Sequence, residues 1–314
     1  IIKFMLGPYI AYKNNRLGYR GNKVFPPIKY FNPNRSFPTS ELKHRIFQFH
    51  DNPIWRSLMK INNQIFISAV EYFNQMGALF TCLPLTTRMI SSPGAVYGRE
   101  KINYTSDTCP ITLKWFNEKR PIFLSESSQI YLELALLTRG VNHVYSIYNS
   151  FRKEKADATH LCEFHHIEYE GKVTQEENEK IILRLIKKII EDLLTHNTKD
   201  LTVFLSTSKI KELETFISKI ENVPRITFKE ALQILYHDTK QEKYKKFTTK
   251  YFGMWEEVRL TYLFKNMVII KNFPLLEVPF YHATVPQIKV KWKDGKKEKE
   301  SFLADNADFI WPGY

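Results

Sequence analysis

Cysteine is scarce in this sequence of 314 residues, which has three cysteines and no Cys-x-x-Cys pair. Neither a disulfide framework nor a cysteine zinc site is therefore indicated. Long apolar runs are lacking as well, because none approaches the roughly 18 residues that span a bilayer. There is also no basic-then-apolar leader with a small-residue cleavage site. We therefore expect a soluble, cytoplasmic protein with no membrane partner.

Acidic residues are in short supply, with 33 Asp and Glu against 46 Lys and Arg, and the net charge is +13. This excess favours an anionic partner such as ATP or a nucleic acid, although a bias toward Lys, Ile, Asn, Phe and Tyr raises the charge without any function. Residues 1–40 contain seven Lys and Arg and no acid, and they are rich in Gly, Pro and Asn. We expect a basic N-terminal extension over residues 1–40 and one folded domain over residues 41–314.

Hydrophobic periodicity indicates the fold class. Apolar residues recur at helical spacing in residues 55–77 and 174–194, and Thr174 is a residue type that begins helices. Alternating patterns predict strands at 143–148 and 162–170, and a hairpin at Asp294-Gly295. Strands in hairpins with helices between them indicate an α+β fold, with a largely antiparallel β-sheet flanked by helices.

Residues 148–170 carry the most informative pattern. A Phe-Arg-x-Glu run ends one predicted strand, and after a polar loop the next strand follows with His-x-x-Glu-Phe. Side chains two apart on a strand point the same way, so Arg152 and Glu154 are expected to face one site. A guanidinium in this position can hold a phosphate in line with an attacking carboxylate. This order of residues resembles motif 2 of the class II aminoacyl-tRNA synthetases.

The resemblance implies a role in ATP binding for four residues. Arg152 would hold the α-phosphate as the catalytic residue, and Glu154 would contact the adenine amino group. His160 would reach the γ-phosphate and Phe164 would stack on the purine. The structural alternative is a surface cross-strand pair for Arg152 and Glu154, and a core position for Phe164. The complete ordered set favours the synthetase interpretation.

Residues 124–133 resemble the Ser-Gly-Gln-Leu-Tyr-Leu-Glu segment of the amino-acid pocket in asparaginyl-tRNA synthetases. The resemblance assigns five residues to the substrate amino acid: Ser127, Gln129, Glu133, His166 and Glu168. Where the aspartyl branch has a Lys that meets the substrate carboxylate, this chain has Leu132. A pocket with Glu133 and no ammonium should prefer an amide or another neutral side chain, because unpaired like charges in a cleft are costly. An ordinary helix start is the alternative for this segment.

Two further segments extend the resemblance. Residues 81–87 around Pro84 are similar to motif 1, the dimer-forming element, so we expect a two-fold homodimer. Residues 307–313 are similar to the strand whose Asp, together with a following Glu, binds the Mg²⁺ ions on the ATP phosphates; this makes Asp308 the implied metal ligand. The Glu and the Gly-rich motif 3 do not follow, and the chain does not begin with Met. We therefore expect it to be part of a longer protein.

The resemblance covers about residues 42–314 and implies that the chain uses ATP to activate asparagine or a similar amino acid as an aminoacyl-adenylate. The residues before Glu41 are too few, and too broken by Pro and Asn, for an anticodon-binding barrel. We therefore expect a core that transfers the amino acid to an acceptor other than tRNA. Three alternatives stay open: a genuine asparaginyl-tRNA ligase that grips tRNA with residues 1–40, a synthetase that makes asparagine from aspartate and ammonia, and a non-catalytic binding or regulatory paralogue.

Overall fold

The computed structural model describes residues 53–88, 96–97, 100–101, 111–114, 119–120, 122–152, 162–278 and 281–311. The predicted extension over residues 1–40 lies outside these ranges. The α-helices are α4 (Pro53–Gln75), α5 (Gln129–Leu136), α6 (Gln175–His196), α7 (Thr198–Leu201), α8 (Thr207–Ser218), α9 (Phe228–Thr239) and α10 (Met254–Phe264). The 3₁₀-helices are η3 (Ile220–Asn222), η4 (Glu242–Lys245), η5 (Thr249–Tyr251) and η6 (Leu275–Glu277). Within the described ranges, no helix combines the length and the apolar character that a membrane crossing requires.

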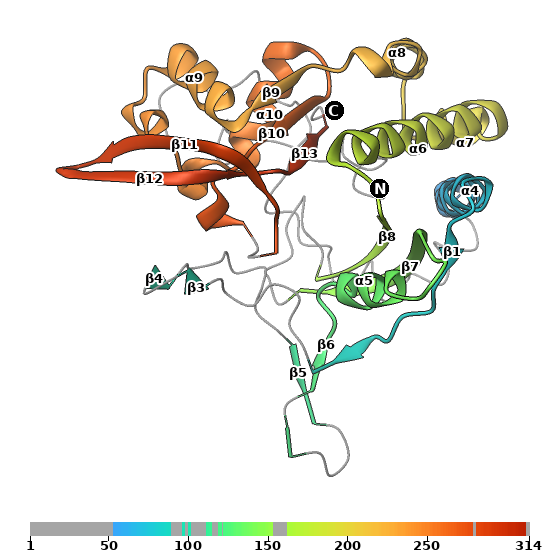
Figure 1. Cartoon of the computed structure of the whole chain (residues 1–314). Helices are drawn as coiled ribbons and strands as arrows, with labels where there is room; N and C mark the ends of the chain where they lie inside the picture. The colour runs from blue at the N-terminus through green and yellow to red at the C-terminus, as the bar shows by residue number, and fades with distance from the viewer. Residues whose placement is uncertain are drawn as a thin grey trace.

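The candidate site is built on two three-stranded sheets (Figure 1). Their strands are β1 (Leu79–Phe80), β7 (His143–Phe151) and β8 (Glu163–Gly171) in the first sheet, and β9 (Arg225–Thr227), β10 (Val268–Lys271) and β13 (Ala307–Ile310) in the second. In the first sheet, β7 lies between a parallel β1 and an antiparallel β8. In the second, β10 lies between an antiparallel β13 and a parallel β9.

The remaining strands are β2 (Thr86–Thr87), β3 (Val96–Tyr97), β4 (Glu100–Lys101), β5 (Ile111–Leu113), β6 (Ile122–Leu124), β11 (Thr284–Asp294) and β12 (Lys297–Ala304). They form the order β2-β6-β5 and the pairs β3-β4 and β11-β12, all antiparallel. Most strand pairs are therefore antiparallel and helices pack against the sheets, which confirms the α+β prediction.

Helix α6 covers the same side of both central sheets, and Figure 1 shows it above β8 and beside β13. Its Ile189 shares a buried cluster with Tyr145 of β7 and with residues of α4. Its Leu183 shares a second buried cluster with Ile269 of β10, and Phe309 of β13 packs against this second cluster. Because side chains alternate along a strand, the residues between these positions point away from α6.

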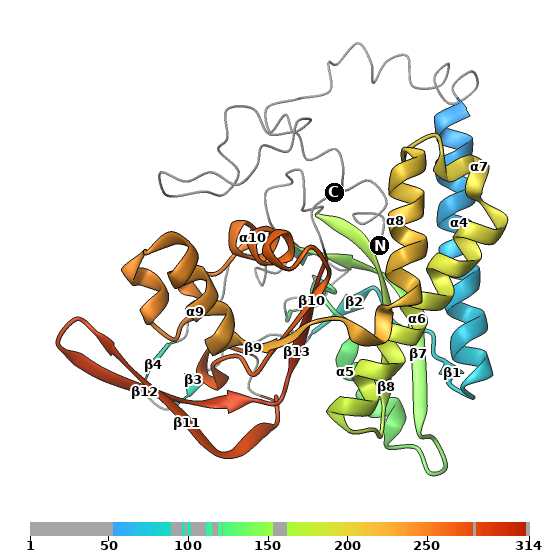
Figure 2. The same cartoon turned by 90° about the horizontal axis from the view of Figure 1, so that it is seen from above.

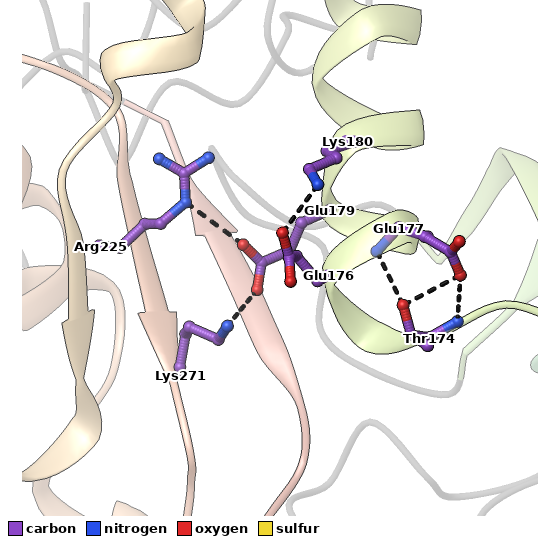
Figure 3. Close-up of polar contacts among 7 residues, drawn as sticks. All are labelled: Thr174, Glu176, Glu177, Glu179, Lys180, Arg225 and Lys271. Atoms are coloured by element: carbon purple, nitrogen blue, oxygen red, sulfur yellow. Dashed lines mark hydrogen bonds and ion pairs between the residues drawn. The ribbon is translucent and has the colours of Figure 1, made fainter.

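The start of α6 is fixed by polar contacts that Figure 3 shows. Thr174 caps the helix as predicted: its Oγ1 accepts a hydrogen bond from Glu177 N at 3.2 Å, and Glu177 Oε2 accepts one from Thr174 N at 2.8 Å. One turn later, the buried Glu179 forms ion pairs with Arg225 of β9 and Lys271 of β10. These pairs join the helix to the second sheet.

The elements predicted from periodicity are present. Residues 55–77 correspond to α4, and β7 and β8 match the two predicted strands. The hairpin at Asp294-Gly295 is β11–β12, in which Asp294 pairs with Lys297. Gly295 has a φ of +65°, a backbone conformation that glycine adopts without strain.

Candidate functional site

One face of the β7–β8 pair carries polar and aromatic side chains, together with Val144. The face consists of the cross-strand pairs Ser150–Phe164, Tyr148–His166, Ser146–Glu168 and Val144–Glu170. The alternate residues, such as Tyr145 and Tyr169, pack against α4 and α6. The polar face is therefore turned away from these two helices.

Arg152 and Phe164 lie together at one end of this face. Arg152 directly follows β7, and its backbone N–H donates to the carbonyl oxygen of Cys162 at 2.9 Å. Its guanidinium carbon lies 5.2 Å from the centre of the Phe164 ring, a cation–π contact. The structure thus brings together two of the four predicted ATP residues, and the other two, Glu154 and His160, lie outside the described residues.

His166 continues the face next to Phe164, with the two rings perpendicular and their centres 4.9 Å apart. Its Nδ1 shares a hydrogen bond of 2.6 Å with Ser150 Oγ. Burial, and after it the charge of Arg152, lowers the pKa of His166 to about 4, so the imidazole is neutral at pH 7. The neighbouring His165 is exposed and contacts Phe66 of α4, so the two histidines point to opposite faces of the strand.

Tyr148 connects this face to the segment before α5. Its hydroxyl accepts a hydrogen bond from Ser128 N at 2.9 Å, lies 3.5 Å from Ser127 Oγ and donates to the Glu168 carboxylate. Burial, and after it the charge of Glu168, raises the pKa of Tyr148 above its ordinary value, so the hydroxyl keeps its proton. The sequence analysis missed Tyr148, although alternation counted back from Arg152 places residues 148, 150 and 152 on one side of the strand.

The predicted pocket residues of α5 are also joined to each other. Gln129 Nε2 donates to Glu133 Oε1 at 2.9 Å, and Gln129 N donates to Ser127 Oγ at 3.2 Å. The hydroxyl of Tyr281, which was not assigned to the site from the sequence, donates to Gln129 Oε1 at 3.4 Å. Leu132 is completely buried, so an apolar side chain stands where the resemblance places the Lys of the aspartyl branch.

Two carboxyl groups on this side of the site, Glu168 and Glu170, are affected by the negative charge of Glu133. Burial raises the pKa of Glu168, and this effect is larger than that of the hydrogen bond from Tyr148, which lowers the pKa. Burial, and then the charges of Glu168 and Glu133, raises the pKa of Glu170 to about 8. Glu170 is therefore mostly protonated at pH 7. The sequence analysis missed this residue, which continues the alternation of Phe164, His166 and Glu168.

Asp308 lies on β13, opposite Ile270 of β10. Its neighbour Phe309 packs on the α6 side, so Asp308 points away from α6, as does the polar face of β7–β8. Its side chain is exposed on one side, while the protein around the rest raises its pKa to about 6. The carboxylate of Asp308 makes no hydrogen bond or ion pair with any other described residue.

A free carboxylate of this kind fits Mg²⁺, which usually binds through one or two carboxylates, waters and substrate phosphates. Asp308 is the residue that the resemblance assigns to the ion, and the described ranges contain no group of three or more His, Cys, Asp or Glu residues that could hold a metal.

Comparison with known proteins gives three consistent findings. The family model described as tRNA synthetases class II (D, K and N) matches residues 38–314. The asparagine–tRNA ligase of Koribacter versatilis (strain Ellin345) is 29% identical over 272 residues, which are 81% of this chain and 55% of that protein. The chain therefore spans about half the length of this curated relative.

Solved structures share the fold. The asparaginyl-tRNA synthetase of Pyrococcus horikoshii, complexed with asparaginyl-adenylate, aligns with a TM-score of 0.66 at 22% identity, over 92% of this chain and 59% of that chain. A putative aspartyl-tRNA synthetase from Leishmania major Friedlin aligns with a TM-score of 0.62 at 17% identity, over 89% of this chain and 55% of that chain. At these identities the alignments establish the architecture.

Proposed function

Because the chain belongs to the class II tRNA synthetases of the D, K and N type, we propose that it is a ligase that activates an amino acid with ATP. The observation that carries the proposal is the pair of Arg152 and Phe164 at the end of the β7–β8 face, with the predicted amino-acid residues beside it. A cation and an aromatic ring in this position suit a nucleotide phosphate and a purine.

In the proposed reaction, a carboxylate oxygen of the amino acid attacks the α-phosphorus of ATP. A bond from that oxygen to phosphorus forms, the bond from phosphorus to the bridging oxygen breaks, and pyrophosphate leaves with the electron pair. The Arg152 guanidinium stabilises the negative charge that builds up on the α-phosphoryl oxygens. Asp308 would hold Mg²⁺, which supplies further positive charge to the phosphates.

We propose asparagine, or an amino acid with a similar neutral side chain, as the substrate. Ser127, Gln129 and Glu133 would orient its α-ammonium group, and Glu168, held by Tyr148, would face the rest of the molecule. Among the described residues that we assign to the substrate, His166 is neutral, Leu132 is apolar, and Glu133 and Glu168 are acids, so a second carboxylate on the substrate would find no cationic partner among them. This arrangement favours an amide over aspartate.

For the acceptor we propose tRNA, because the family and the curated relative are tRNA ligases. The expectation of a different acceptor rests on residues 1–40, which lie outside the described ranges, and it stays a prediction. A homodimer, the bound Mg²⁺ and a cytoplasmic location are also parts of this proposal.

The test is amino-acid-dependent exchange of pyrophosphate into ATP, measured with a panel of amino acids and with or without tRNA. We expect exchange with asparagine and not with aspartate. Arg152→Ala should reduce exchange by at least about a hundredfold, the usual effect of losing one group that stabilises transition-state charge. The matched control is Arg139→Ala, which removes an exposed guanidinium just after α5 and should leave exchange unchanged.

Exchange with aspartate alone would contradict the assignment of the amino-acid pocket. An Arg152→Ala variant with normal exchange would contradict the assigned phosphate site. Transfer of the activated amino acid to ammonia or another amine, and not to tRNA, would contradict the proposed acceptor while leaving the adenylation step intact.

A further inference from the structure

The positive charge of this chain is concentrated in a few segments. Residues 240–250 contain five lysines and one acid, and residues 289–300 contain six lysines and three acids. Outside these two segments and residues 1–40, the chain has 28 basic and 29 acidic residues, which nearly cancel. The surplus is therefore local, and a composition bias spread over the whole chain does not account for it.

The two lysine-rich segments form one surface in the folded chain, which we call the lysine lobe (residues 240–250 and 289–300). Lys246 Nζ donates to Asp294 Oδ1 at 2.7 Å, and the rings of Phe247 and Trp292 contact each other at 6.0 Å. Both rings belong to the apolar cluster beneath α9 and α10. Figures 1 and 2 both show the β11–β12 hairpin projecting on the side of the molecule opposite α4.

The alternation of β11 presents its lysines to solvent. Val290 and Trp292 pack toward the apolar cluster, so Lys289, Lys291 and Lys293 point the other way, and all three are exposed. Lys296 and Lys297 follow in the exposed turn and at the start of β12. The hairpin thus presents five lysines along one projecting ribbon.

The acids of the lobe neutralise only part of this charge. Asp294 is shared by Lys246 and Lys299, and Glu300 pairs with Lys289. Across the described residues, Lys293, Lys296 and Lys297 form no ion pair. An exposed cluster of unpaired ammonium groups repels itself, and an anionic partner would relieve that repulsion.

We propose that the lysine lobe binds the sugar–phosphate backbone of RNA. This inference rests on the proposed tRNA acceptor, and it assigns that partner a second contact surface, separate from the Arg152 site. Lysine binds phosphate as a point charge and needs no base contact, so the lobe would fix the position of the RNA without reading its sequence. RNA is favoured over a membrane because the proposed acceptor is itself an RNA, and because the tip of the hairpin, residues 293–299, includes no apolar side chain that could insert into a lipid surface.

The test compares two variants of the 314-residue chain with equal changes in charge. The lobe variant is Lys291→Gln with Lys293→Gln, Lys296→Gln and Lys297→Gln. The control variant is Lys60→Gln with Lys199→Gln, Lys211→Gln and Lys219→Gln, which changes four exposed lysines in α4, in α7, in α8 and directly after α8. Binding of a fluorescent tRNA transcript is measured by anisotropy between about 50 and 200 mM salt.

We expect the lobe variant to bind at least about tenfold more weakly than the wild type near 100 mM salt. Its salt slope should be smaller by about one for each phosphate contact that is lost. The control variant should keep wild-type affinity and slope, and both variants should keep pyrophosphate exchange without tRNA.

Wild-type binding by the lobe variant, or an equal loss in the control, would overturn the inference. So would binding of the wild type to vesicles of phosphatidylserine and phosphatidylcholine but not to tRNA. If the wild type shows no pyrophosphate exchange but the lobe variant still binds tRNA more weakly, the proposed adenylation is contradicted and the RNA-binding role of the lysine lobe is not. The failure of one proposal can therefore be told from the failure of the other.

Discussion

At the scale of single residues, the candidate pocket contains carboxyl groups that cannot all be ionised at low cost. Glu170 is affected most, because its pKa is raised to about 8 by burial and by the charges of Glu168 and Glu133. A group with a raised pKa in the folded chain keeps a proton that the unfolded chain has already lost. It therefore contributes stability below its ordinary pKa of 4.5, and that stability disappears as the pH rises through 8.

We predict that the free energy of unfolding decreases between about pH 6.5 and 8.5, and that Glu170→Gln flattens this decrease by about 1–2 kcal/mol. The predicted pH range starts at 6.5 because of His166. Its pKa is lowered in the folded chain, so below pH 6.5 this residue makes the free energy of unfolding increase with pH. Urea denaturation followed by circular dichroism at several pH values measures the slope. Glu163→Gln, at the exposed start of the same strand, should keep the wild-type slope, and an unchanged slope in Glu170→Gln would contradict the prediction.

Single residues of the site were predictable from the sequence where a motif holds them at a fixed spacing. Arg152, Phe164, Gln129 and Glu133 are examples, and the structure places each pair in contact. Tyr148 was missed because its role depends on two partners far away in the sequence, Ser128 and Glu168. Spacing within one segment does not reveal such a connection.

At the scale of elements, α6 is the part that relates the two halves of the site. It packs on the sheet that carries Arg152 and on the sheet that carries Asp308. The ion pairs of Glu179 with Arg225 and Lys271 fix its first turns against the second sheet (Figure 3). A shift of α6 would therefore alter the distance between the two sheets.

We predict that Glu179→Gln lowers the free energy of unfolding by about 1–3 kcal/mol, because it removes a buried negative charge between two cations. This loss of stability is smaller than the loss expected for breaking a fully buried ion pair, because both cations are partly exposed and water can solvate them. Chemical denaturation measures the change. The matched control is Glu176→Gln on the same turn, where the pair with Lys180 is exposed and its loss should have no measurable effect. Equal stability of the two variants would show that Glu179 does not join the helix to the sheet.

The sequence predicted most elements because their signals are local. The cap at Thr174, the apolar stripe of α6 and the turn at Gly295 each depend on residues a few positions apart. The packing of α6 on two sheets depends on two neighbouring stripes, one with Ile189 and one with Leu183. The sequence shows these as one apolar face, so it did not predict which strands each stripe covers.

At the scale of the whole molecule, the sequence revealed the total charge but only part of its distribution. Residues 1–40 are basic by simple counting. The lysine lobe becomes visible only in the folded chain, because the contact of Lys246 with Asp294 joins segments that are far apart in the sequence. Exposed apolar surface is likewise visible only in the folded chain, because the fold decides which apolar side chains stay uncovered.

Such a surface lies on β1, an outer strand of the first sheet. Leu79 and Phe80 are 55% and 52% exposed, and Leu85 in the segment that follows is 48% exposed. These residues lie in or next to the segment that resembles the dimer-forming motif 1. Apolar side chains on a sheet edge favour association with another chain, and a two-fold dimer would cover them.

We predict that the wild-type chain sediments as a dimer at micromolar concentration and that Leu79→Asp sediments as a monomer. The substitution would place a charge in an apolar interface, where it has no partner, while the exposed position lets the monomer fold. Sedimentation equilibrium measures the state, and circular dichroism checks the fold. Leu137→Asp is the matched control, because Leu137 is 79% exposed at the end of α5, outside the segment that resembles motif 1, and should leave the dimer intact. A monomeric wild type, or a Leu79→Asp variant that remains dimeric, would exclude β1 as the dimer contact.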